Sequence, residues 1–370
     1  MKDELMLLID GREHRGWENA KITRSIERGV HSFSLALSDR WGAAEETNPR
    51  TVTAGMNVDV YINDELLTRG YIDQIAPSYT DTSHIINVQG RSKVADLVDC
   101  STKGKQFKGQ SLLQICQALC KPFSIAVSVD DAVQNLANKR FVGRNHKLDL
   151  GQPIWEFLEE IARLRGVLLV SDSQGDLRII RAGSAVADVA LVLGKNIKRG
   201  DGQYSTHSVF SEYHVSGQQP SSPNYGFIGA DNTKTVAQAA QAASNSINRY
   251  RPFYTSSDNP LSIAECQARA DWQKNVNEGR AETTTYTVSG WRQDEDGRLW
   301  QPNELVDIVD PWIGLDDRRL IVETSITLGE GGSTTTLKIM PKEAFAMKPI
   351  DRKTSKKKDL GFIFPPKGTQ

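Results

Sequence analysis

The chain has 370 residues, more than one hydrophobic core usually supports, so we expect about two to four domains. Hydrophobic residues make up 38% of the sequence, which is low for a large enzyme but ordinary for a β-rich assembly protein with much surface. The formal net charge of −1 predicts no overall attraction to nucleic acid or to an anionic membrane, and no apolar run is long enough to span a bilayer.

Residues 1–92 are predicted to form a first β-barrel domain. The segments 32–38 and 58–62 alternate apolar and polar side chains, the pattern of strands with one buried and one exposed face. Asn63-Asp64-Glu65 favours a hairpin turn. Because residues 1–10 hold only five consecutive apolar residues between acids, we expect a first strand there and no signal peptide.

Residues 93–185 predict an α+β domain inserted after this barrel. Ser111 is a suitable N-cap for a helix that starts at Leu112 and stops at Pro122. A strand over 123–129 is expected to follow.

A second helix of this insert is introduced by Pro153, which suits a first helical turn, and it ends at Gly166. A hairpin over 167–180 is expected after it. The side chains expected to face inward from this helix are Ile154, Trp155, Phe157, Leu158, Ile161, Ala162 and Leu164.

Residues 186–282 are predicted to form a mixed connecting domain. Its segment 218–260 is rich in Gln, Ser, Asn, Pro and Ala, which predicts an excursion that is partly mobile or ordered by a partner. Within it, 236–243 could be helical. Ser262 is expected to cap a further helix.

A second β-barrel unit is predicted over 283–347, completed by strands from 197–217. The remaining residues, 348–370, read as an extended basic and apolar tail, with six Lys or Arg between 348 and 358. A segment this basic cannot bury enough surface to fold alone. We expect its exposed apolar residues to dock on another subunit or a partner: Phe362, Ile363, Phe364 and Pro365.

No signature of catalysis or cofactor binding is present, so we expect neither an enzyme nor a cofactor. Phosphate-binding loops, dinucleotide turns, nucleophile elbows and zinc-protease motifs are all missing from the sequence. The six histidines are scattered, and the four cysteines (Cys100, Cys116, Cys120 and Cys266) offer no second ligand pair with metal spacing. Buried thiols in a reducing cytoplasm are the favoured interpretation, and no metal is expected.

Three clusters could suggest other functions. The acids Asp294-Glu295-Asp296 and Asp316-Asp317 could flank a glycosidic bond, but neighbouring Gly and Arg residues favour solvated turns. Trp291, Trp300 and Trp312 could bind sugars, although a barrel core or subunit interface is favoured. The run 356–358 carries three lysines, too few for a specific nucleic-acid site.

The most informative pattern is an echo between the two ends of the chain. Segment 55–62, a short turn and segment 68–75 are matched by 303–309, an Asp- and Gly-rich loop and 319–326. Each copy closes with another alternating run, 83–88 in the first copy and 334–339 in the second. Two similar strand–loop–strand–loop–strand units predict two copies of one small β-barrel.

Several segments, taken in order, also carry a resemblance to a known family. They are Gly55-Met56-Asn57-Val58-Asp59-Val60 through Gly70-Tyr71-Ile72-Asp73, Val88-Gln89-Gly90-Arg91-Ser92, Asp96-Leu97-Val98-Asp99-Cys100-Ser101, Pro153-Ile154-Trp155 to Gly166, Ala270-Asp271-Trp272, Val288-Ser289-Gly290-Trp291 and Trp300-Gln301-Pro302-Asn303. In this order and spacing, the chain resembles the baseplate hub protein of Mu-like contractile-tail bacteriophages.

The resemblance implies a structural protein of the virion, assembled in the bacterial host cytoplasm. It implies a homotrimer whose two barrels per subunit form a pseudo-six-fold ring between a hexameric tail tube and a trimeric spike, in contact with other baseplate proteins. The duplication within the sequence also favours this ring, because a trimer of chains with two similar units each presents six similar edges. A tail-associated cell-wall glycan hydrolase and a carbohydrate-binding module remain the alternatives.

Overall fold

The computed structural model describes residues 3–38, 52–81, 84–141, 145–183, 185–219, 236–244, 246–256, 263–295 and 297–345. The chain divides into two compact units. The first unit comprises Met1–Tyr204, Glu282–Asp307 and Arg318–Lys342, and the second comprises Ser205–Ala281, Ile308–Asp317 and Glu343–Gln370.

One 14-stranded sheet belongs to the first unit, except for the ends of two strands within Ile308–Asp317. Its strands are β1 (Leu5–Ile9), β2 (Arg12–His14), β3 (Asn19–Ser25), β4 (Ser32–Ser38), β5 (Asn57–Ile62), β6 (Glu65–Tyr79), β7 (His84–Ser92), β13 (Ala185–Val186), β14 (Leu191–Val192), β15 (Ile197–Tyr204), β19 (Glu282–Ser289), β20 (Glu304–Asp310), β21 (Leu315–Gly329) and β22 (Gly332–Met340). Neighbours follow the order β15-β19-β22-β21-β3-β4-β7-β6-β5-β1-β2, and β20 pairs with β13, β14 and β21. The predicted mainly β fold is confirmed.

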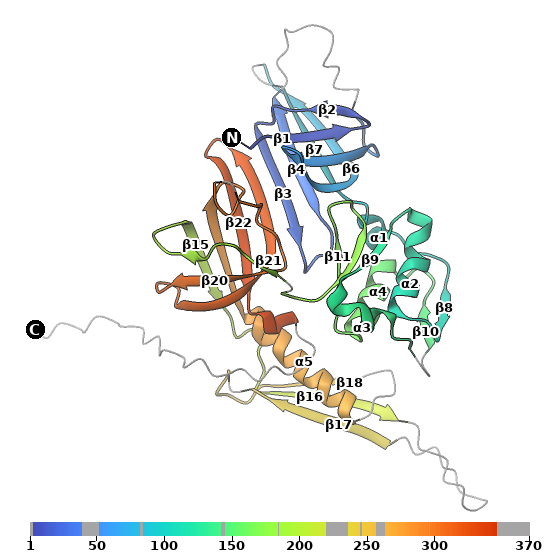
Figure 1. The fold of residues 1–370 in the computed structure, drawn as a ribbon. Coiled ribbons are helices and arrows are strands. Elements are labelled where there is room, and N and C mark those ends of the chain that lie inside the picture. The colour runs from blue at the N-terminus through green and yellow to red at the C-terminus, as the bar shows by residue number, and fades with distance from the viewer. Residues whose placement is uncertain are drawn as a thin grey trace, which may run out of the picture. The chain divides into compact units, whose positions relative to one another are not determined.

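The two predicted barrel domains meet at the antiparallel pair of β3 and β21, which lie side by side in Figure 1. The register runs from Ser25 opposite Glu323 to Ala20 opposite Leu328. Among the described residues, the strands therefore form one continuous sheet and not two separate closed barrels. The pairing covers an edge that each group of strands would otherwise expose.

Side chains from both groups of strands share one hydrophobic core. Leu7 and Val60 from the N-terminal group pack in the same cluster as Trp291 and Ile326 from the C-terminal group. The strict alternation of β5 accounts for its buried face, as predicted from its sequence.

The α+β insert is present, with its own core. Its elements are α1 (Ala95–Asp99), β8 (Lys105–Lys108), α2 (Leu112–Cys120), β9 (Val127–Val129), α3 (Gln134–Asn138), β10 (Asn145–Leu148), α4 (Ile154–Arg163), β11 (Leu168–Ser171) and β12 (Leu177–Ile180), with 3₁₀ turns over Lys121–Phe123 and Asp131–Val133. Ser111 caps α2 as predicted, within a full capping box that includes Gln114.

Two predictions for the insert were wrong in detail. The strand expected over 123–129 is confined to β9, because Lys121–Phe123 is a 3₁₀ turn and Ser124 has a left-handed φ of 56°. Leu164 does not face inward but is 43% exposed, because α4 ends at Arg163 and Leu164 is its C-cap.

The second unit contains a three-stranded sheet in the order β17-β16-β18, formed by β16 (Glu212–Gln219), β17 (Val236–Ala243) and β18 (Pro252–Ser256). Helix α5 (Ile263–Ala281) shares the core of this sheet, where Cys266 and Ala270 lie in one cluster with Tyr213 and Val215. A 3₁₀ turn, Lys342–Phe345, lies near the end of the described chain.

The suggested helix over 236–243 was wrong, because this segment is strand β17, paired with β16 along its whole length. Cross-strand hydrogen bonding here prevails over the helical preference of alanine. Within the predicted excursion 218–260, the described residues thus include the end of β16 and all of β17 and β18. Residues 220–235, 245 and 257–260 lie outside the described residues, as does Ser262. Of the segment 197–217, β15 pairs with β19, whereas β16 belongs to the second unit's sheet.

Among the described residues, no helix combines the length and the apolar composition needed to cross a membrane.

Candidate assembly surface

The two repeated segments carry the same ion pair at equivalent positions. In the first copy, Arg69 on β6 donates from Nε and Nη2 to the two carboxylate oxygens of Asp59 on β5, both at 2.7 Å. In the second copy, Arg318 on β21 donates in the same way to Asp307 on β20, at 2.7 and 2.8 Å. Such a bidentate pair adds geometric specificity as well as energy, so each copy ties the same two strands together in the same way.

The surroundings of the two pairs differ. The side chain of Asp59 is 14% exposed, whereas that of Asp307 is 51% exposed. Hydrogen bonds from Arg318 lower the pKa of Asp307. Arg69 makes a further bond, from Nη1 to Gln174 Oε1 at 2.9 Å, which links the first copy to the insert.

The backbone repeats as closely as the side chains do. The N–H of Gly55 donates to the carbonyl of Ile72 at 2.7 Å, and the N–H of Asn303 donates to the carbonyl of Ile321 at 2.8 Å. Both donors have positive φ, 91° and 72°. The pairing register shifts immediately after each of the two isoleucines, where a β-bulge lies. The sequence echo therefore corresponds to a duplication of geometry.

The loops at the ends of these hairpins are not repeated. In the first copy, β5 and β6 are joined by the two residues Asn63 and Asp64. Asn63 is held by the N-terminal segment: its Oδ1 accepts from the Glu4 N–H at 2.9 Å and its Nδ2 donates to Asp3 Oδ1 at 2.8 Å. The N-terminal segment therefore holds Asn63 in place, while Asp64 stays exposed.

The corresponding loop of the second copy is longer and carries Trp312, which is 87% exposed. Asp310, almost fully buried, accepts on Oδ1 from the N–H of Trp312 at 3.0 Å and from that of Ile313 at 3.1 Å. The N–H of Gly314 donates to the Asp310 carbonyl at 2.9 Å. Pro311 restricts φ at the next position. The loop thus holds an exposed tryptophan on an ordered backbone.

A cluster around Arg292 joins the repeats within the first unit. Its Nε donates to Asp3 Oδ1 at 3.0 Å, and its Nη1 donates to Glu65 Oε1 at 2.7 Å and to the Gly297 carbonyl at 3.1 Å. The side chain of Arg292 is only 19% exposed, so these bonds satisfy a charge that is largely removed from water.

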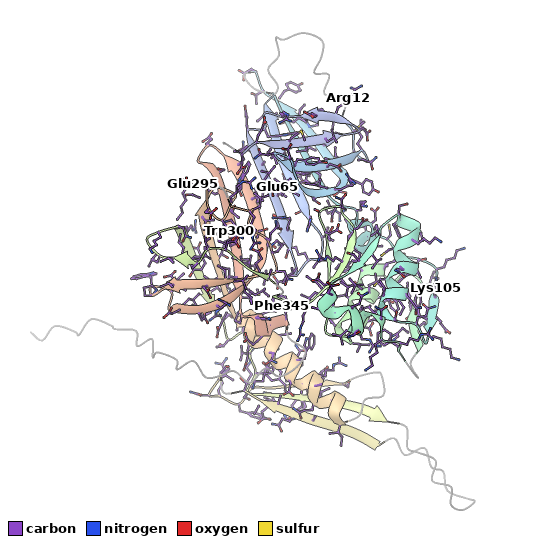
Figure 2. The ribbon with its side chains drawn as sticks, in the orientation of Figure 1. Arg12, Glu65, Lys105, Glu295, Trp300 and Phe345 are labelled. Atoms are coloured by element: carbon purple, nitrogen blue, oxygen red, sulfur yellow. The ribbon has the colours of Figure 1, made fainter. Side chains whose placement is uncertain are left out.

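The alternatives weighed from the sequence find little support in the geometry. Trp291 and Trp300 are 2% and 1% exposed and belong to the core, as the favoured interpretation predicted; only Trp312 is open to solvent. Figure 2 shows Trp300 among the strands and Glu295 at the periphery. Asp294 and Glu295 lie in an exposed turn, and Asp296 lies outside the described residues. Among the described residues, the lining of a pocket beside Trp300 includes no Asp or Glu.

The described part of the chain contains no group of three or more His, Cys, Asp or Glu that could hold a metal ion. All four cysteines are free thiols, and Cys116, Cys120 and Cys266 are buried. Burial raises the pKa of Cys120 to about 12 and also raises that of Cys116, which disfavours their reactive thiolate forms.

The predicted docking residues of the tail, Phe362, Ile363, Phe364 and Pro365, lie outside the described residues. Sequence patterning had not identified the paired forks of Arg69–Asp59 and Arg318–Asp307. The signal becomes readable only when the two repeats are aligned with a one-residue gap in the loop, because Arg318 lies one position further from Asp307 than Arg69 lies from Asp59.

Comparisons with known proteins agree on one family. Residues 4–92 match the N-terminal domain described as Mu phage baseplate assembly protein GpP-like, 94–181 match the second domain of baseplate hub protein gp44-like, and 262–348 match the fourth domain of Mu phage baseplate assembly protein GpP. The chain is 31% identical to baseplate hub protein gp44 of Escherichia phage Mu, over 96% of this chain and 93% of that protein.

Solved structures extend the likeness to the fold. The 43 kDa tail protein of prophage MuSo2 from Shewanella oneidensis is 31% identical, with a TM-score of 0.80 over 93% of this chain and 99% of that one. The E. coli c3393 protein, described as a type VI secretion component similar to T4 tail proteins gp27 and gp5, shares the fold at 11% identity. Its TM-score is 0.57, over 93% of this chain and 79% of that one.

The duplicated strands and these matches define a phage tail protein of the baseplate. More particularly, the chain belongs to the family of the Mu baseplate hub protein gp44 and is a structural component of a Mu-like virion.

Proposed function

We propose that the chain forms a homotrimer in which two related β units per subunit make a pseudo-six-fold ring. In this proposal, the ring units are residues 1–92 and 283–347, while 93–185 and 186–282 are outer and connecting domains. The ring adapts a hexameric tail tube on one side to a trimeric spike on the other, within a contractile tail.

The observation that carries this proposal is the residue-level duplication. Two copies that share an Arg–Asp fork, a backbone hydrogen bond and a bulge offer two similar surfaces per chain. Three such chains around a three-fold axis present six similar surfaces, which is what contact with a six-fold partner requires. The fold shared with a protein described as similar to T4 gp27 and gp5 supports a place beside a spike.

The tail is part of the same proposal. In this proposal, residues 348–370 form an extended tail whose apolar residues dock on a neighbouring subunit or another baseplate protein: Phe362, Ile363, Phe364 and Pro365. Their apolar composition, next to six basic residues, supports this role. Equal protease sensitivity of the segment in the free chain and in assembled baseplates would contradict it.

Light scattering behind a sizing column tests the assembly. We expect the mass of three chains, either for the protein alone at high concentration or after addition of the spike protein. A stable dimer would contradict the proposal, because two-fold pairing cannot build the ring. A chain that stays monomeric with both the spike and tube proteins present would also contradict it.

A non-enzymatic role follows from the same proposal. A tail-associated glycan hydrolase requires two carboxylates placed across a bound sugar. Clearing of peptidoglycan by the purified chain, lost on replacement of Asp294, would favour the hydrolase instead.

A further inference from the structure

The duplication has one conspicuous break in symmetry, at the hairpin ends. The first copy ends in the two-residue turn of Asn63 and Asp64, where the chain's own Asp3 and Glu4 bind Asn63. The second copy ends in the loop 311–314, which presents Trp312 at 87% exposure.

We infer that the Trp312 loop binds a trimeric partner whose subunits each offer one apolar pocket with a basic rim. This inference rests on the proposed ring. In a trimer, six hairpins would be related by pseudo-six-fold symmetry, but only three of them carry the tryptophan. The six subunits of a six-fold partner would face two kinds of hairpin in alternation, three with the tryptophan and three without it. The three subunits of a three-fold partner can each contact one tryptophan hairpin, so all three contacts are identical.

The local structure suits a binding anchor. Asp310 holds the backbone N–H groups of Trp312 and Ile313, so little ordering is left to do when a partner binds. Tryptophan is among the residue types most enriched at energetic centres of interfaces. Val309, 43% exposed at the end of the preceding strand, adds apolar surface close to Trp312 in the sequence.

Acidic residues near the Trp312 loop are the reason to expect basic groups around the partner's pocket. Asp316 and Asp317, both exposed, lie shortly after the loop in the sequence. Complementary basic groups on the partner would speed encounter and favour one docking register.

The test compares Trp312→Ala with Tyr79→Ala, a matched control at an aromatic residue that is 81% exposed on β6. Binding of the purified trimeric spike protein and of the tail tube protein is measured for each, together with oligomeric mass. We expect Trp312→Ala to keep the trimer and tube binding and to weaken spike binding roughly thirtyfold, the change expected at an energetic centre. Trp312→Phe, which keeps an apolar ring, should retain most of the affinity.

Unchanged spike binding in Trp312→Ala, or an equal loss of tube binding, would overturn the inference while leaving the proposed ring intact. The inference would also be overturned if Tyr79→Ala weakened spike binding as much as Trp312→Ala does. A wild-type chain that neither trimerises nor binds the spike would instead overturn the proposed function, and the inference with it.

Discussion

Arg318 holds Asp307 through two hydrogen bonds, at 2.7 and 2.8 Å, with the same donor and acceptor atoms by which Arg69 holds Asp59. The two pairs lie in strands far apart in the sequence but equivalent in the duplicated sheet. A fork at the same strand positions in both copies fixes the same pairing of neighbouring strands, so both repeats keep one shape although most of their side chains differ. That common shape is what a ring of six similar units needs.

The two forks should differ in what they contribute to stability. Arg69→Met removes bonds to Asp59, which is 14% exposed, and to Gln174, so we expect a loss of about 1 kcal/mol in the free energy of unfolding. Arg318→Met removes an exposed pair and should cost less, because water screens both charges. Urea unfolding of both variants measures the difference. A larger loss for Arg318→Met would contradict this ranking.

Packing of the insert against the first β strands depends on Gly29. A Cβ at this position would lie 2.2 Å from Trp155 Cζ2 and 2.9 Å from the Leu169 carbonyl oxygen, and its φ is +67°. We expect Gly29→Ala to lower the free energy of unfolding by about 2 to 4 kcal/mol, from overpacking and backbone strain.

Gly11→Ala is the matched control, since Gly11 has a similar φ of +82° but no atom within 4 Å of an added Cβ. It carries the backbone strain without the clash, so thermal unfolding should show a clearly smaller loss. Equal losses for the two variants would mean that the contact with Trp155 contributes nothing.

Acid should destabilise the protein through His31. Full burial, with a smaller contribution from the charge of Arg24, lowers the pKa of His31 to about 3 from an ordinary 6.5. Between these values the unfolded chain binds a proton that the folded chain does not, so stability falls as the pH falls. The slope is about 1.4 kcal/mol per pH unit.

We therefore expect His31→Gln to flatten the dependence of unfolding free energy on pH between 6.5 and 4, relative to the wild type. His207→Gln, at an exposed histidine, controls for the loss of an imidazole as such. An identical slope in wild type and His31→Gln would show that His31 is protonated in the fold.

Much of this architecture is predictable from the sequence because its signals are local. Alternation predicts β5, and Ser111 with Gln114 predicts the start of α2. The strand β17 is not predictable in this way, since an alanine-rich segment becomes a strand only through its pairing with β16. The joining of β3 to β21 likewise depends on contacts across about three hundred residues of chain, which no local pattern records.

The candidate assembly surface likewise has features that the sequence shows and a contrast that only the structure shows. The exposed Trp312 and the turn at Asn63 stand out in the sequence only as residue types. Their contrast emerges when the structure shows the N-terminal segment bound to Asn63 and Trp312 open to solvent.

Arg292 should be more sensitive to replacement than an exposed arginine that also bridges two carboxylates. Its bonds to Asp3 and Glu65 tie the N-terminal segment and β6 to the loop after β19, and it is 19% exposed. Arg292→Ala would leave Asp3, itself 18% exposed, without this partner in a site poor in water. We expect a loss of about 2 kcal/mol in the free energy of unfolding.

Arg15→Ala provides the comparison, because Arg15 also bridges two carboxylates, Glu4 and Glu13, but is 44% exposed. Its replacement should change stability far less, since water solvates all three groups once the bridge is gone. Chemical denaturation of both variants measures the difference in their losses of unfolding free energy. We expect the slope of unfolding free energy against denaturant concentration to stay unchanged in both. If Arg15→Ala lowered the free energy of unfolding as much as Arg292→Ala, burial would not be the reason for the sensitivity of Arg292. A general effect of charge near the N-terminus would then explain both losses.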